Sequence, residues 1–311
     1  MKLKVWIALI AVYLVWGSTY LAIRFVVESI PPLFSAGLRF LISGAILYFW
    51  RRSQGDPAPS RVQWRAAAII GLLLLLGGNG GLVWAEQYIP SGISSLFIAT
   101  TPLWMVLIDS LRPGGKSPGW LTWLGVLFGL AGIVLLIAPW QNGFSGASHL
   151  NPFGVAALLF AAFSWTIGSL YSRKAPLPAS PLLYTGMEML AGCASLFVLS
   201  GLTGEWTRLD LSVIQPRSLW GLAYLIFFGS LIGFVSYTWL LRNAPTPLVS
   251  TYAYINPLIA ILLGVLFADE SLNIWMIISA AIIIGSVVII NYARYSARQP
   301  ASPTQLTTGD D

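Results

Sequence analysis

The sequence predicts an all-α polytopic membrane protein with ten transmembrane helices, arranged as two inverted five-helix repeats. Only 9% of its 311 residues are charged, whereas an ordinary soluble domain carries about a quarter. Apolar stretches of about 20 residues, each long enough to cross a bilayer as a helix, recur along the chain. The two halves of the chain also align with each other.

Each predicted helix is an apolar run between short loops that mostly contain Pro, Gly or Ser. The first run follows a basic start but continues to Ile23 without a small-residue cleavage pattern, so we expect an uncleaved span. The spans are predicted at residues 4–27, 32–50, 64–85, 91–111, 119–138, 150–171, 180–200, 217–240, 246–267 and 273–292. They form two domains, 1–140 and 141–293, followed by a polar tail at 294–311 that we expect to be disordered and cytoplasmic.

Basic residues lie mostly on one side of the predicted membrane. If the N-terminus is cytoplasmic, 13 of the 17 Lys and Arg residues lie on that side, two lie opposite, and Arg24 and Arg39 lie within or at the edge of spans. An excess of basic residues marks the cytoplasmic side. We therefore expect a multi-pass protein of the cell inner (plasma) membrane with both termini in the cytoplasm, and no nucleic-acid partner.

The chain contains an internal repeat. An offset of 155 residues aligns span four with span nine and matches Pro102 with Pro257, and spans one and six align with Trp16 over Trp165. Five spans are an odd number, so the second copy must enter the membrane from the opposite side. Inverted repeats are typical of secondary transporters whose site lies near the bilayer midplane between the halves.

Several stretches resemble a known family. The segment GGNGGLVWAEQYIPSGISSLFIATTPLW, together with VWGSTYLAIR, GLRF and LFADESLNIWMIISAAIIIG, is similar to the tandem EamA-domain members of the drug/metabolite transporter superfamily, specifically the YedA-like drug/metabolite exporters. The resemblance covers residues 4–292. It implies that spans one, three, four, six, eight and nine surround a central cavity. In EamA domains an acidic-basic turn often joins the fourth and fifth helices; Glu270 fits it, whereas the first half has LRPGGKSP there.

Two prolines lie in the middle of predicted spans. Pro102 and Pro257 each remove a backbone hydrogen bond and are expected to kink their helices. Irregular backbone at this depth faces protein or water rather than lipid, so the kinks are expected at the cavity, with Thr101 and Asn256 beside them. A purely structural role for the prolines is the alternative.

Aromatic and polar side chains gather in the spans around the expected cavity. Tryptophans at span ends commonly anchor at the membrane interface, but deeper ones suit a cavity for an amphipathic, aromatic or cationic solute. Asn79 in GGNGG forms either an interhelical hydrogen bond or a substrate contact. The predicted substrate-binding residues are Trp16, Thr19, Asn79, Trp84, Thr101, Trp104, Trp165, Tyr237, Tyr252, Tyr254 and Asn256.

Two charged residues of opposite sign, Arg39 and Glu188, match each other in the repeat. A charge inside a membrane is costly and marks a function or a pair. Glu188 is a candidate for proton coupling, because a carboxylic acid held out of water keeps its proton more readily; a structural ion pair or hydrogen bond is the alternative. We expect Arg39 to pair with Glu188, Glu28 or Glu86 and mainly to order the bundle, with substrate binding as the alternative.

Signals for an enzyme are absent from the sequence. The single His149 lies in a loop, no nucleophile and base are paired, and the GGKS at 114–117 lacks the first glycine of a phosphate loop at Ser110. No cofactor or metal is expected. The prediction is a monomeric secondary active exporter of small metabolites or drug-like compounds, amino acids included, by alternating access, with protons as the coupling ion. A passive channel, a non-transporting membrane assembly protein and an intramembrane enzyme are the alternatives.

Overall fold

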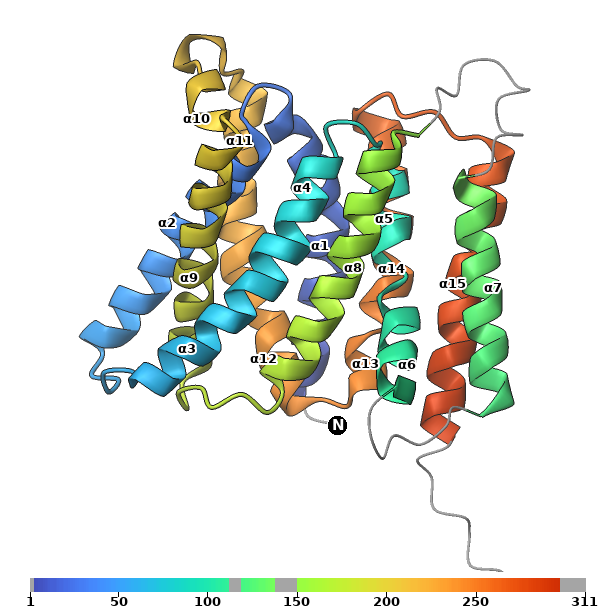
Figure 1. Ribbon diagram of the computed structural model, residues 1–311, viewed down its shortest axis with the longest axis horizontal. Coiled ribbons are helices and arrows are strands. Elements are labelled where there is room, and N and C mark those ends of the chain that lie inside the picture. The colour runs from blue at the N-terminus through green and yellow to red at the C-terminus, as the bar shows by residue number, and fades with distance from the viewer. Residues whose placement is uncertain (1–2, 112–118, 138–149, 297–311) are drawn as a thin grey trace, which may run out of the picture.

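The structure, a computed structural model, describes residues 3–111, 119–137 and 150–296. These residues form a bundle of helices lying side by side, and no strand occurs among them (Figure 1). The start of the first helix and the end of the last lie at the same end of the bundle. The all-helical class predicted from the sequence is confirmed.

The first half follows the predicted spans, but its third and fourth spans are composite. The third contains a π-helical stretch between two α-helices, and the fourth is broken in the middle. Its elements are α1 (Leu3–Val27), α2 (Pro32–Ser53), α3 (Arg61–Ile70), η1 (Gly71–Gly80), α4 (Gly81–Ala85), α5 (Ser91–Ile98), α6 (Thr101–Leu111) and α7 (Trp120–Ile137).

The second half has the same order of long segments, again with a π-helical stretch in the third of its five spans. Its elements are α8 (Pro152–Ser172), α9 (Pro181–Leu202), α10 (Glu205–Arg208), the 3-10 turn η3 (Leu211–Val213), α11 (Pro216–Tyr224), η4 (Leu225–Phe234), α12 (Val235–Asn243), α13 (Thr246–Val249), α14 (Tyr252–Phe267) and α15 (Ile274–Ser296). The final helix therefore continues to Ser296 and includes the first three residues of the predicted tail, and the rest of that tail lies outside the described residues.

In the described part of the chain, eight helical segments are long and apolar enough to cross a membrane. Two shorter apolar helices, Trp120–Leu136 and Ile255–Phe267, lie at the fifth and ninth predicted spans. The count of ten spans stays a prediction. Many large apolar side chains on the outside of the bundle are exposed, including Ile7, Phe160 and Trp220, as expected of a surface that faces lipid rather than water.

Helix starts are encoded locally. Proline occupies the first helical position of α2, α8, α9 and α11, where its missing N–H would have no intrahelical partner anyway. The Asn151 side chain accepts hydrogen bonds from two backbone N–H groups of α8, and Ser180 caps α9. Ser60 and Gln63 form a reciprocal capping box at the start of α3.

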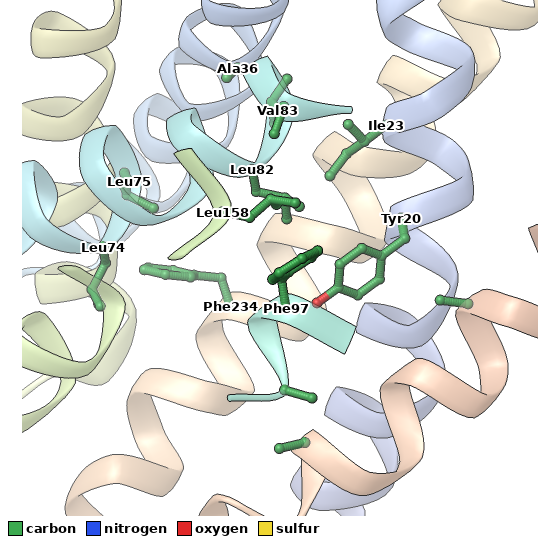
Figure 2. Packing of buried hydrophobic residues seen from close by; sticks show 14 of the residues in the cluster. Tyr20, Ile23, Ala36, Leu74, Leu75, Leu82, Val83, Phe97, Leu158 and Phe234 are labelled. Carbon is green, nitrogen blue, oxygen red and sulfur yellow. The ribbon is translucent and has the colours of Figure 1, made fainter. Parts of the chain in front are cut away.

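The helices pack in a pattern that crosses between the two halves. The main contacts join α2 to α9, α7 to α15, α1 to η4 and α14, and α8 to η1, α5 and α6. A buried core lies where these helices meet, and Figure 2 shows Tyr20, Leu82, Phe97 and Phe234 gathered there. This packing places α1 and α8, with their tryptophans, at the centre of the bundle.

Replacing Gly71 by alanine is expected to lower the thermal stability of the protein. A Cβ at this position would lie 2.6 Å from the Glu188 carbonyl oxygen and 2.8 Å from the Gly192 amide nitrogen. Both are backbone atoms of α9, so α9 would have to shift, at a cost of about 1–3 kcal/mol. Melting temperatures of the detergent-solubilised protein measure the effect. Gly285→Ala in α15 is the control, because a Cβ there meets nothing within 4 Å, and equal melting temperatures for the two variants would contradict the prediction.

Candidate functional site

Four aromatic side chains from four helices meet in the middle of the bundle. The ring of Trp16 (α1) lies 5.4 Å from that of Trp165 (α8), 4.8 Å from that of Tyr237 (α12) and 5.6 Å from that of Tyr252 (α14), measured between ring centroids. Such spacings are typical of favourable edge and tilted aromatic contacts. The structure thus brings together four of the predicted substrate-binding residues, which we call the aromatic cluster.

Hydrogen bonds fix the orientation of these rings. The Trp16 indole N–H donates to the Gly229 carbonyl at 3.2 Å, and the Trp165 indole N–H donates to the Tyr237 hydroxyl at 3.0 Å. The same Tyr237 hydroxyl lies 2.7 Å from that of Ser169. Because buried polar atoms are costly to leave unpaired, these bonds hold the aromatic cluster in one arrangement.

Each of the two tryptophans in the aromatic cluster packs against a glycine in a π-helical stretch. A Cβ at Gly233 in η4 would lie 2.5 Å from the Trp16 Nε1 atom, and a Cβ at Gly78 in η1 would lie 2.7 Å from the Trp165 Cε3 atom. Gly78 and Gly233 are separated by 155 residues, the repeat offset found in the sequence. These glycines therefore make room for the indoles, and the GGNGG segment serves packing at Gly78.

A cavity lies beside the aromatic cluster. Its volume is about 50 Å³, counted as the space open to the centres of water molecules, which is enough for several waters by the same measure. Its wall contains six predicted residues and seven others. The lining residues are Trp16, Thr19, Tyr20, Arg39, Phe40, Gly78, Asn79, Leu82, Ile98, Ala161, Trp165, Phe234 and Tyr252.

Some of the lining residues that sequence reasoning missed had a readable signal. Tyr20 follows Trp16 by four residues and so shares its helix face, and Phe40 adjoins Arg39. Phe234 had no such signal, because its position depends on how η4 packs against α1 and α2. The resemblance implied six spans around the cavity, and the structure adds α2, which contributes Arg39 and Phe40.

Arg39 does not have the carboxylate partner that we expected. Its Nε donates to the Ser230 hydroxyl at 2.8 Å, and its guanidinium lies 4.7 Å from the centre of the Phe40 ring. An ion pair within 4.0 Å joins Arg51 to Asp56, and none of the described carboxylates forms one with Arg39. Arg39 faces η4 and the cavity instead, because its side chain bonds to Ser230 of η4 and forms part of the cavity wall.

The expected partners of Arg39 lie elsewhere. Glu28 is exposed, and Glu86 and Glu188 are fully buried. The carboxylate oxygens of both buried residues have no hydrogen-bond partner among the described residues. Glu188 is not part of the cavity wall, and the opposite charge that acts on it is that of Arg242 in α12.

The prolines break their spans differently. Helix α5 ends at Ile98, just before Pro102, and the Ile98 carbonyl accepts a hydrogen bond from the Thr101 hydroxyl at 2.7 Å. Pro257 lies inside α14, whereas the interruption in that span precedes Tyr252. The interruptions of the two spans therefore do not fall at matching repeat positions, and the carbonyl released by Pro102 accepts a hydrogen bond from the side chain of Thr101.

The remaining predicted residues lie outside the cavity wall. When the Asn256 amide is oriented with its nitrogen toward the carbonyls of Tyr13 and Tyr252, it donates to them at 3.2 and 3.3 Å. This side chain therefore joins α14 to α1. The Trp84 ring packs on Tyr88 and the Trp104 ring on Phe163. Tyr254 belongs to α14, but its side chain lies outside the described part of the structure.

Two carboxylates of the second half bind helix N-termini of the first half. Glu270 accepts hydrogen bonds from the Ser91 backbone N–H at 2.6 Å, the Ser91 hydroxyl at 2.7 Å and the Gly92 N–H at 3.0 Å. Glu205 accepts from the Leu33 and Phe34 N–H groups at 3.3 and 2.8 Å. Negative charge at a helix N-terminus is favourable, so both contacts tie the halves together.

No group of three or more His, Cys, Asp or Glu residues that could hold a metal ion occurs within the described ranges. The polar groups of the cavity are instead a guanidinium, an amide, hydroxyls and indoles. Such a set can bind and orient a solute through hydrogen bonds, charge and aromatic contact.

Comparison with known proteins agrees with this architecture. The EamA-like transporter family matches residues 3–138 and again residues 152–292. The chain is 37% identical over 298 residues to the inner membrane transporter YedA of Escherichia coli (strain K12), covering 95% of this chain and 92% of the relative. It is 27% identical over 302 residues to the protein PecM of Dickeya dadantii (strain 3937), with 94% of each chain covered.

More distant matches extend the comparison. The chain is 25% identical over 289 residues to a chloroplastic WAT1-related protein of Arabidopsis thaliana, At3g02690, covering 92% of this chain and 69% of that protein. One solved crystal structure superposes with a TM-score of 0.65 at 21% identity, covering 96% of this chain and all of that chain, and shows the same fold. The two family matches together cover nearly the whole chain, and this protein therefore belongs to the EamA-like transporter family.

Proposed function

We propose that this protein is a secondary active transporter that exports small metabolites or drug-like compounds, working by alternating access around the cavity beside the aromatic cluster. The observation that carries the proposal is the cavity wall, to which both halves of the chain contribute aromatic and polar side chains. A site between two halves is where rocking of one half against the other exposes a solute to each side in turn.

Reciprocal contacts support the pseudo-two-fold relation between the two halves that an inverted repeat requires. The second helices of the two halves, α2 and α9, pack against each other, and so do the fifth helices, α7 and α15. The first helix of each half packs on the third and fourth spans of the other half. The pairs Trp16–Gly233 and Trp165–Gly78 follow the same rule. Such reciprocal contacts are what two copies related by a pseudo-two-fold axis make.

Two acidic residues at matching repeat positions extend this pattern. The alignment that matches Arg39 with Glu188 also matches Asp56 with Glu205. Glu205 binds the N-terminus of α2, and the side chain of Ser180, the cap of α9, interacts with Asp56 and lowers its pKa. With the N-terminus in the cytoplasm, as the basic residues favour, Asp56 lies at the inner face and Glu205 at the outer face.

The stability contributed by Asp56 is expected to depend on pH. Hydrogen bonds from Arg51, together with the nearby Ser180 side chain, lower the pKa of Asp56 below its ordinary value. A carboxyl with a lowered folded-state pKa contributes stability above its ordinary pKa and loses it as the pH falls through the folded-state value. The melting-temperature difference between wild type and Asp56→Asn should therefore shrink as the buffer is acidified from neutral pH. A difference that is constant with pH would contradict this expectation.

Counterflow in liposomes tests the proposed function. Purified protein would be reconstituted and assayed with a panel of amino acids, organic carboxylates and amphipathic cations. Saturable uptake driven by internal substrate supports a carrier, whereas unsaturable flux indicates a passive channel. Movement of none of these solutes would overturn the proposal and favour a non-transporting assembly protein, which should also tolerate changes at Trp16, Asn79 and Asn256 without a phenotype.

Proton coupling at Glu188 belongs to this proposal. Its carboxylate is fully buried and has no hydrogen-bond partner in the described chain, and an intramembrane carboxylate of this kind is the usual carrier of a proton. Glu188→Gln should therefore abolish acceleration of uptake by a proton gradient while leaving exchange of substrate for substrate measurable. Gradient-driven uptake that survives in Glu188→Gln would remove this residue from the coupling step.

A further inference from the structure

The cavity contains one charged side chain, and it is positive. Arg39 is only 4% exposed and lines the cavity wall. Of its nitrogen atoms, Nε is bonded to Ser230, and the terminal Nη2 atom lies beside Gly229 and Thr19, since a Cβ on Gly229 would be 2.9 Å from it. No carboxylate of the described residues lies within 4.0 Å of the guanidinium. The positive charge is held in place by a neutral hydroxyl, and none of the described residues neutralises it through an ion pair.

Neighbouring residues fix the Arg39 side chain in this position. The Ser230 hydroxyl fixes Nε, the Phe40 ring lies beside the guanidinium, and Gly229 provides the space for Nη2. A buried guanidinium without a counter-charge is unfavourable. It is retained most simply where a negatively charged ligand completes the pair during binding, since guanidinium binds carboxylates through charge-assisted, often bidentate hydrogen bonds.

A second polar atom on the wall lacks a partner. The Asn79 amide oxygen is buried and accepts no hydrogen bond within the described residues, and Asn79 lines the same cavity. It presents an acceptor, which complements an N–H or O–H group. The remainder of the wall is largely aromatic or aliphatic, with Trp16, Phe40, Trp165 and Phe234 among its members.

The chemistry of the wall selects among the solutes that an aromatic cavity could take. Aromatic faces alone would suit a cation, but none of the described lining residues is acidic, and Arg39 would repel a cation at short range. We infer that the substrate is an organic monoanion: its anionic group pairs with Arg39 and its apolar body lies against the aromatic cluster. This inference rests on the proposed function and names the substrate class of the same cavity.

Three probes of similar shape and different charge test the inference. Binding of phenylacetate, 2-phenylacetamide and 2-phenylethylammonium to the purified full-length protein in lipid nanodiscs would be measured by calorimetry. Phenylacetate is expected to bind at least about tenfold more tightly than either of the others, because one charged hydrogen-bonded pair is worth about that much. Equal or tighter binding of the cation by the wild-type protein would overturn the inference, and this comparison needs no variant. Failure to bind phenylacetate, benzoate and hexanoate at millimolar concentration would overturn it as well.

Variants test whether the preference for an anion arises at Arg39. Arg39→Gln should abolish the advantage of phenylacetate over phenylacetamide, and Arg39→Lys should keep part of it. Ser230→Ala, which only releases Nε, should reduce it. Arg217→Gln is the matched control, because this arginine is exposed, lies over Phe25 and is not part of the cavity wall. An unchanged anion preference in Arg39→Gln would place the anion elsewhere.

Counterflow separates this inference from the proposed function. Selective binding of phenylacetate without counterflow of any solute would uphold the anion site and overturn the transporter proposal. Saturable counterflow of amphipathic cations that carboxylates do not inhibit would uphold the transporter and overturn the anion site. Counterflow of carboxylates that requires Arg39 supports both.

Discussion

Trp16→Ala is expected to reduce substrate counterflow about tenfold or more and to lower the melting temperature, whereas Trp6→Ala in the same helix should leave both near wild type. The Trp16 ring contacts three other rings of the aromatic cluster and donates to the Gly229 carbonyl. Aromatic pairs contribute about 0.5–1.5 kcal/mol each beyond buried area, and about 1.4 kcal/mol corresponds to a factor of ten in affinity. Trp6 is 45% exposed on the outside of α1.

Gly233→Ala provides a second route to the same result. The added Cβ would lie 2.5 Å from Trp16 Nε1, so the indole must move although no ring atom is removed. Counterflow and melting temperature should both fall relative to Gly285→Ala, whose Cβ meets nothing within 4 Å. If Trp16→Ala and Gly233→Ala both transport at the wild-type rate, the aromatic cluster is not part of the transport site.

Glu270→Ala is expected to destabilise the protein by about 2 kcal/mol or more. The Glu270 carboxylate accepts three hydrogen bonds at the start of α5, and losing a helix N-cap costs about 0.5–2 kcal/mol, with a further penalty for charged hydrogen bonds that are lost. The Gly264 backbone leaves room for this side chain, since a Cβ there would lie 2.5 Å from Glu270 Oε2. Thermal unfolding in detergent measures the loss.

The matched control is Asp269→Asn at the neighbouring, exposed position. It removes one negative charge at the same loop and keeps a residue type that tolerates the positive φ of 52° found there. Glu270→Gln should be intermediate, because its amide oxygen still accepts from α5 while the charge is gone. Similar melting temperatures for Glu270→Ala and Asp269→Asn would show that the carboxylate does not hold α5.

Much of the fold could be predicted because the membrane imposes its own length on each element. Apolar runs bounded by Pro, Gly and Ser placed the helices within a few residues, as α9 at Pro181–Leu202 shows against the expected 180–200. The repeat alignment matched Trp16 with Trp165, and these two rings meet in the structure. Local sequence patterns were sufficient to place the helices, and the internal similarity was sufficient to relate the two tryptophans.

Other features depend on lateral packing, which a linear pattern does not contain. Sequence reasoning estimated the depth of Arg39 and Glu188 in the membrane but not the direction in which each side chain points. The π-helical stretches η1 and η4 were also missed, because no periodicity separates them from α-helix in runs as uniformly apolar as LLLLL. Glu270 was noted only as part of a turn, since the helix that it caps lies 179 residues earlier in the chain.

That separation has a consequence for the order in which the chain is made. The N-terminal N–H groups of α5 find their acceptor only when Glu270 is made, 179 residues after Ser91, and those of α2 must similarly await Glu205, 171 residues after Phe34. Helix α1 likewise packs on η4 and α14, which are synthesised much later. The first half of the chain therefore enters the membrane before its partners exist. Although each half matches the family separately, the contacts of α1, α2 and α5 are completed only by residues of the second half.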